Sequence, residues 1–136
     1  MKKALIVYGG WPGHEPEKCT EIIKGMLEPE GYEVRAEYQT SAFAEDYVHE
    51  MDLLIPIVTM AFHFDPIGEI KKTAVNNVIK AVHNGCGLAG HHGGMCDAFR
   101  QSIDWQFLTG GQWVSHPNGI HDYKVNITKK DDPIME

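Results

Sequence analysis

Two adjacent histidines lie in a glycine-rich stretch of the sequence, Gly85-Cys-Gly-Leu-Ala-Gly-His-His-Gly-Gly94. A short apolar run precedes them and a helical pattern from Asp97 to Leu108 follows, which is typical of a strand, a sharp turn and a helix. The glycines beside His92 are expected to supply the positive φ of that turn, because they carry no Cβ. Such a turn displays its central side chain at the edge of an α/β sheet where ligands bind. His92 is therefore the predicted catalytic residue.

Other histidines follow the ends of predicted strands. His14 and His63 each come shortly after an apolar, strand-like run, and His116 lies in a later loop rich in glycine and aromatic residues. The carboxyl ends of parallel strands meet at one edge of a sheet, so these imidazoles are expected near His91 and His92. A group of this kind acts as general bases, as metal ligands or as hydrogen-bonding groups for sugar hydroxyls. The residues alone leave all three roles open.

A divalent transition metal such as zinc is one candidate cofactor, with His14, His63 and His92 as its ligands. The chain has no HExxH or HxH pattern, so the spacing does not itself indicate a metal. His91 and His92 are neighbours and are not expected to point the same way, so one of the two is predicted to be buried against a backbone carbonyl.

The remaining histidines and the cysteines have ordinary structural interpretations. The histidines at 49, 83 and 121 are predicted to be surface residues. Cys86 precedes its strand and lies at the wrong end for catalysis, and Cys19 belongs to the apolar face of a helix. Cys96 is expected at a helix N-terminus, where a thiolate would be favoured, although a packed role is preferred. An odd number of cysteines without a CxxC pair indicates reduced thiols.

The elements that must position these residues follow from hydrophobic patterning. Continuous apolar runs predict central strands, alternating runs predict strands exposed on one face, and apolar positions three and four apart predict helices. The expected central strands are Lys3–Tyr8, Met51–Ile57 and Cys86–Ala89; the alternating strands are Tyr32–Tyr38, at an edge, and Asp122–Thr128; the helices are Pro16–Leu27, Ile67–Val82 and Asp97–Leu108, with a helical turn at Phe43–His49. The predicted fold is α/β, with three layers around a mainly parallel sheet in a flavodoxin-like order.

Composition bounds the partners. The 136 residues fit a single domain, 1–136, and the net charge of -7 argues against a nucleic acid or an anionic membrane. No apolar run approaches the roughly 18–20 residues needed to span a bilayer, and the N-terminus does not resemble a signal peptide. A cytoplasmic protein that binds a small neutral or cationic ligand is expected.

Three segments carry a resemblance to a known family: the histidine stretch above, Thr109-Gly-Gly-Gln-Trp113 with His116-Pro117, and Asp131-Asp-Pro-Ile134. They resemble the ThuA-like, or trehalose-utilisation, family, which is similar in fold to class I glutamine amidotransferases. The resemblance runs over essentially the whole chain and implies a role in carbohydrate (disaccharide) metabolism. In the amidotransferase relatives a nucleophilic cysteine stands where His92 stands here. Because an imidazole cannot form the thioester, the resemblance implies no glutaminase activity.

The chain departs from the family pattern in two places. Family members commonly carry His-Pro-Ile where this chain has Asp132-Pro133-Ile134. They also usually continue through further strands, so the chain is expected to be truncated at its C-terminal end. A partial sheet exposes an apolar edge, which favours association into a homo-oligomer.

Two functions from different classes follow. The first is a sugar-processing enzyme in which His92 acts as general base or metal ligand and the other strand-end histidines bind substrate or metal. Trp11, Phe62 and Trp113 would then stack on the sugar ring, while His14, His63, His91 and His116 bind its hydroxyls. The second is a non-catalytic carbohydrate-binding or regulatory module on the same scaffold. Both take a small-molecule sugar as partner.

Overall fold

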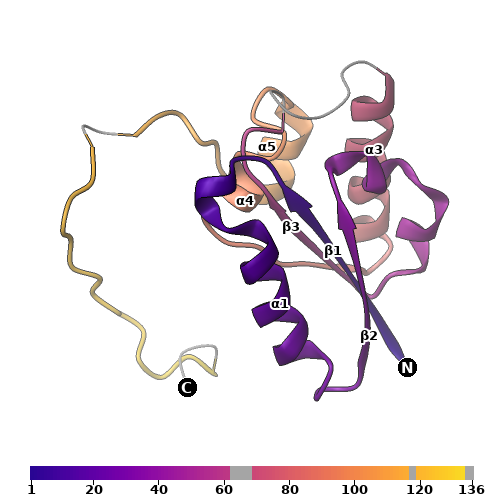
Figure 1. Cartoon of the computed structure of the whole chain (residues 1–136), viewed down its shortest axis with the longest axis horizontal. Helices are drawn as coiled ribbons and strands as arrows, with labels where there is room; N and C mark the ends of the chain where they lie inside the picture. The colour runs from indigo at the N-terminus through magenta and orange to yellow at the C-terminus, as the bar shows by residue number, and fades with distance from the viewer. Residues whose placement is uncertain (62–68, 117–118, 134–136) are drawn as a thin grey trace.

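The computed structural model describes residues 1–61, 69–116 and 119–133. Within these ranges four strands form one parallel sheet in the order β2-β1-β3-β4 (Figure 1). The strands are β1 (Lys2–Gly9), β2 (Tyr32–Tyr38), β3 (Leu53–Val58) and β4 (Gly87–Leu88). The predicted parallel sheet is confirmed, with β1 and β3 in the centre and β2 at an edge. The prediction that the strand around residues 87–88 is central is wrong, because β4 pairs with β3 alone and lies at the other edge of the described sheet.

Helices cover both faces of this sheet. The helices are α1 (Pro16–Leu27), α3 (Glu69–His83), α4 (His92–Cys96) and α5 (Ile103–Thr109), and shorter 3-10 turns span Pro12–His14, Thr40–Ala44 and Asp46–Glu50. Figure 1 shows α1 and α3 on opposite sides of the strands, with α4 and α5 near the carboxyl ends of the strands. The three-layer α/β prediction is therefore confirmed.

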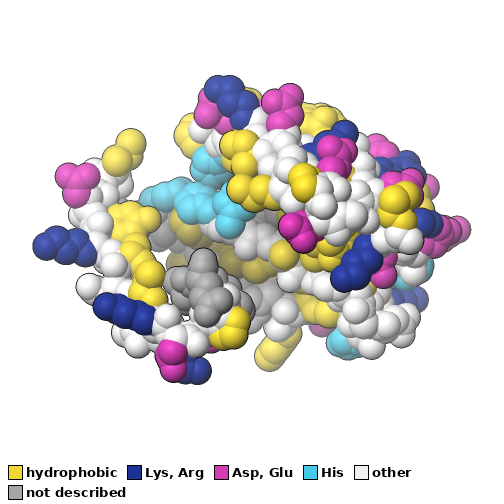
Figure 2. Space-filling model, turned by 90° about the horizontal axis from the view of Figure 1, so that it is seen from below, with side chains coloured by type: hydrophobic (Ala, Val, Ile, Leu, Met, Phe, Trp, Pro, Cys, Tyr) yellow, Lys and Arg dark blue, Asp and Glu magenta, His cyan; other side chains and the backbone are white. Residues whose placement is uncertain are grey.

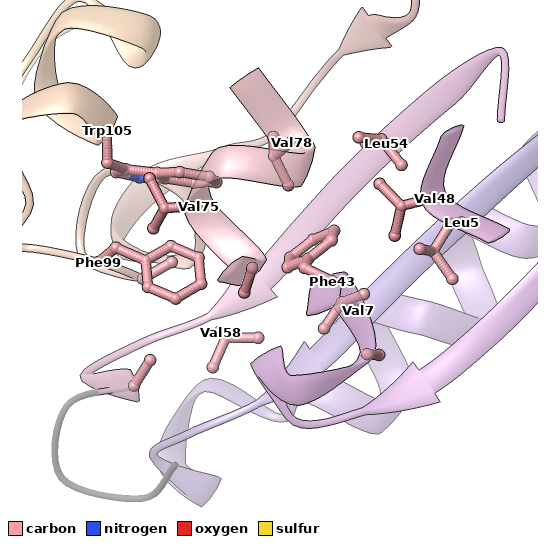
Figure 3. Packing of buried hydrophobic residues seen from close by; sticks show 14 of the residues in the cluster. Leu5, Val7, Phe43, Val48, Leu54, Val58, Val75, Val78, Phe99 and Trp105 are labelled. Carbon is pink, nitrogen blue, oxygen red and sulfur yellow. The ribbon is translucent and has the colours of Figure 1, made fainter. Parts of the chain in front are cut away.

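The core is divided unequally by the sheet. Alternate residues of a strand point to opposite faces, so Leu5 and Val7 join the cluster under α3 while Ile6 packs toward α1. Figure 3 shows the larger cluster, in which the rings of Phe99 and Trp105 lie 4.7 Å apart between centroids. The buried indole N–H of Trp105 donates to the carbonyl oxygen of Met95 at 2.8 Å, so this ring is packed without an unpaired polar group.

The single helix predicted over residues 97–108 is wrong. The structure ends α4 at Cys96 and begins α5 at Ile103. Ser102 caps α5, because its hydroxyl accepts a hydrogen bond from the backbone N–H of Trp105 at 3.3 Å. A serine that caps a new helix competes with continuation of the previous one, and the apolar periodicity does not reveal that competition.

The strand predicted over residues 122–128 is also wrong, since the structure shows these residues extended but unpaired. Tyr123 and Val125 are 84% and 77% exposed. Figure 1 shows this C-terminal segment running away from the sheet. An alternating pattern encodes a strand only where a neighbour supplies the ladder, and the described strands lie elsewhere.

Two further findings concern the surface. The histidines at 49, 83 and 121 are exposed, as predicted. None of the helices in the described ranges is long and apolar enough to cross a membrane.

Candidate functional site

His92 begins α4 in the left-handed region, with φ at 52°. The expectation that its neighbouring glycines supply the positive φ is wrong, because the histidine itself adopts it. This conformation costs a residue with a Cβ about 1–2 kcal/mol. The glycines supply space instead: a Cβ at Gly94 would lie 3.1 Å from the Cα of Ile57 in β3, and one at Gly90 would lie 2.7 Å from the Cβ of Met95. The turn is a strained elbow packed directly on a central strand.

The elbow presents the His92 imidazole to rings from two other segments. The centroid of His92 lies 5.0 Å from that of His14, in the loop after β1, and 5.3 Å from that of Trp113. Trp11 lies 5.0 Å beyond His14, and His116 lies 4.9 Å beyond Trp113. Five of the residues predicted from sequence thus form one continuous row, which we call the ring row.

Histidines gather where the body of the molecule meets the extended C-terminal segment, as Figure 2 shows. Two cavities, of about 280 Å³ and about 200 Å³, both border the His14–His92 pair, and we call the larger one the outer cavity and the smaller one the inner cavity. The outer cavity is lined by Trp11, His14, Thr59, Met60, His92, Gly93, Asp97, Arg100, Trp113, Val114, Ser115 and His116. Gly9, His14, Cys19, Ile57, Thr59, His91, His92 and Gly94 line the inner one.

The predicted burial of one of the two adjacent histidines is wrong. Both His91 and His92 are exposed. His91 occupies the residue before α4 in an extended conformation and borders the inner cavity. The two side chains diverge by the change from extended to left-handed backbone at the elbow, and solvent reaches each of them.

The surroundings of His14 change its acid–base behaviour. Burial lowers the pKa of His14 below its usual value, and positive charge on His92 and then on His116 lowers it further. The carboxylate of Asp97 opposes this effect. At neutral pH His14 is consequently a neutral imidazole, able to accept a proton or a hydrogen bond.

Two buried polar side chains missed by sequence reasoning tie the site together. The hydroxyl of Thr59 accepts a hydrogen bond from the backbone N–H of Trp11 at 3.2 Å, which joins the loops after β1 and β3. The carboxylate of Asp97 accepts one from the N–H of Met60 at 3.1 Å and another from the Nε of Arg100 at 2.5 Å. Asp97 could have been found from its position four residues after Gly93, because one helical turn places it next to the elbow.

The predicted metal set is not supported. His63, like Phe62, falls outside the described residues, and the described ranges contain no group of three or more histidine, cysteine or acidic side chains arranged to hold a metal ion.

The expected place of one cysteine is wrong. Cys96 lies at the C-terminal end of α4, not at a helix N-terminus. Cys86 precedes β4, and burial raises the pKa of its thiol. Cys19, a residue of α1, packs against the strand residues under that helix and borders the inner cavity.

The parallel sheet with helices on both faces, the 2-1-3-4 strand order and the strained elbow define a flavodoxin-like domain of the class I glutamine amidotransferase type, with histidine at the elbow. The family model described as "ThuA: Trehalose utilisation" matches residues 3–136, and the chain belongs to the ThuA family. No curated protein and no solved structure matches the chain.

Proposed function

We propose that this ThuA-family protein is a sugar-processing enzyme of carbohydrate (disaccharide) metabolism that binds its substrate along the ring row. The observation that carries the proposal is the contact between His14 and His92, with tryptophans at both flanks of the pair. Proton-transfer groups in the middle of an apolar aromatic strip suit a ligand with hydroxyl edges and an apolar ring face.

The tryptophans supply the binding surface. Trp11 is 51% exposed and Trp113 is partly exposed, and both border the outer cavity. Large flat side chains lose little conformational freedom when they bind, so they give contact area at small entropic cost. A pyranose ring stacked on either indole would bring its hydroxyls toward the histidines.

The histidines supply the chemistry. Neutral His14 accepts a hydrogen bond from a sugar hydroxyl, and His92 takes a proton from the hydroxyl or water that reacts. General-base catalysis of this kind contributes about 10²–10⁴ in rate. No glutaminase activity is expected, because His92 occupies the elbow where that reaction needs a thiol nucleophile.

One observation favours the non-catalytic alternative. A catalytic histidine is usually oriented by a hydrogen bond from its second ring nitrogen. Within the described ranges, the side-chain hydrogen bonds found do not include such a bond from His92 to a carboxylate. A carbohydrate-binding or regulatory module needs no oriented base and would use the same ring row.

Calorimetric titration with trehalose, followed by assay for released glucose, tests both candidates. The wild type is compared with His92→Ala, Trp113→Ala and the control His83→Ala, which alters an exposed histidine on α3. The enzyme predicts that Trp113→Ala weakens binding, that His92→Ala lowers turnover by about 10²-fold or more, and that the control changes neither. Binding without turnover identifies the module, and the absence of both with trehalose and other disaccharides refutes the proposed ligand class.

A further inference from the structure

Asp97 is a buried carboxylate with no part in the chemistry proposed above. It is 3% exposed and borders the outer cavity. Both of its oxygens accept hydrogen bonds from the protein, one from the N–H of Met60 and the other from Arg100. Its charge acts on His14 through space, raising the pKa of that imidazole, and its hydrogen bonds act on the Met60 turn and on Arg100.

The two turns that meet at Asp97 are both strained. Met60 follows β3 with φ at 55°, and His92 begins α4 with φ at 52°. Residues with side chains keep such angles only where the surroundings impose them, and they concentrate at functional sites. The carboxylate of Asp97 holds Met60 directly, while its backbone N–H donates to the carbonyl oxygen of Gly93 at 2.9 Å, one residue beyond the elbow.

Packing makes the connection stiff. A Cβ on Gly93 would lie 3.0 Å from the Cγ2 of Thr59, so the elbow and the loop after β3 already touch without spare room. Thr59 in turn holds the loop that carries Trp11. A shift of the Met60 turn is therefore transmitted to the elbow on one side and to the loop after β1 on the other.

Arg100 gives Asp97 a second route into the site. The guanidinium borders the outer cavity, and its Nε donates to Asp97 at 2.5 Å. The carboxylate fixes where that cation lies on the cavity wall and balances its charge.

We infer that Asp97 is the positioning residue of this site: its carboxylate locks the Met60 turn against the elbow and thereby sets the orientation of the His92 imidazole and of Arg100. The expected effect of Asp97 on ligand binding rests on the proposed function, whereas its expected effect on the orientation of the imidazole rings does not.

The test compares Asp97→Asn with Asn77→Ala. Asn77 is also buried and also bonds a backbone group, since its amide donates to the carbonyl oxygen of Phe43 at 3.2 Å, but it lies on α3 away from the ring row. Carbon–proton NMR records the imidazole resonances of His14 and His92, assigned with His14→Gln and His92→Gln. Trehalose is the binding probe.

Asp97→Asn is expected to shift the His92 imidazole resonances, and those of His14 also through the lost charge, and to weaken trehalose binding by about 10- to 100-fold, because misplaced groups at a site carry a cost of this order. Asn77→Ala is expected to leave both unchanged at a comparable loss of stability. Resonances that stay in place in Asp97→Asn, or that shift equally in both variants, overturn the inference. If the wild type binds no trehalose, the proposed function fails while the resonances still decide the role of Asp97.

A second variant applies if Asp97→Asn does not fold. Glycine adopts positive φ without strain, so Met60→Gly removes the need for the carboxylate to hold that turn. Adding Met60→Gly to Asp97→Asn is expected to restore folding with the imidazole resonances still displaced. A double variant that remains unfolded overturns the inference, as does one whose resonances return to the wild-type positions.

Discussion

The elbow predicts that His92→Gly stabilises the protein relative to a matched glycine substitution next to it. His92 has φ at 52°, whereas His91, its neighbour, has φ at -140°, and both side chains are exposed. Either substitution gives the unfolded chain more freedom, which costs about 0.5–1 kcal/mol. Only His92→Gly also releases the left-handed strain of about 1–2 kcal/mol.

The two variants are expected to change the free energy of unfolding differently. His91→Gly should lose about 0.5–1 kcal/mol of unfolding free energy. His92→Gly should range from no change to a gain of about 1.5 kcal/mol, less the small contribution of exposed ring contacts. The expected difference between the variants is therefore about 1–2 kcal/mol, in favour of the glycine at the position proposed to be functional.

Urea unfolding followed by tryptophan fluorescence measures this difference, because Trp105 is fully buried and reports loss of the core. Both variants should keep the wild-type slope. If His92→Gly loses as much stability as His91→Gly, the elbow is not strained, and the link between its backbone and the display of His92 is incorrect.

The other predictions concern protonation and packing. The pKa of His14 is lowered on folding, so the unfolded chain binds the proton more tightly, and the stability contributed by neutral His14 is lost as pH falls through the ordinary histidine range. Unfolding curves from pH 8 to 5 should show a shallower loss of stability in His14→Gln than in wild type, and parallel curves would contradict this. Gly94→Ala should cost about 1–3 kcal/mol, because the new Cβ would press on the backbone of Ile57, and a thermal midpoint equal to wild type would show that the strand yields freely. Gly25→Ala, inside α1 with open space around it, should instead raise the midpoint through a gain of about 0.5–1 kcal/mol.

Much of the architecture was readable because it depends on local patterns. The apolar runs of β1 and β3 and the helical spacing of α1 each match what their position in a parallel sheet demands, so pattern and fold agree. The ring row could be predicted from the topology alone, because the loops after β1 and β4 lie at the same edge of a parallel sheet whatever their detailed conformation.

The features that the sequence did not predict share one cause: each depends on contacts or backbone groups that the local sequence pattern does not reveal. The capping role of Ser102 and the bond between Asp97 and Met60 are decided by backbone groups that no periodicity reveals. At the elbow the glycines were expected to adopt the positive φ, but His92 adopts it. Glycine is needed beside His92 because the chain passes close to Ile57 there. The alternating residues 122–128 lacked a neighbour in the described part of the chain.

The unequal cover of the sheet has a consequence for motion. Among the described residues, the buried members of the cluster on the α1 side are Ile6, Ile55 and Ile57, and Ile22 and Met26 on the helix itself are 58% and 65% exposed. Local opening costs least where the fewest apolar contacts must break, so α1 is the layer that detaches first. The loop bearing His14 runs directly into α1, whereas His92 is seated on β3. We therefore expect local opening of α1 to move the His14 ring more than the His92 ring, and so to change the distance between the two rings.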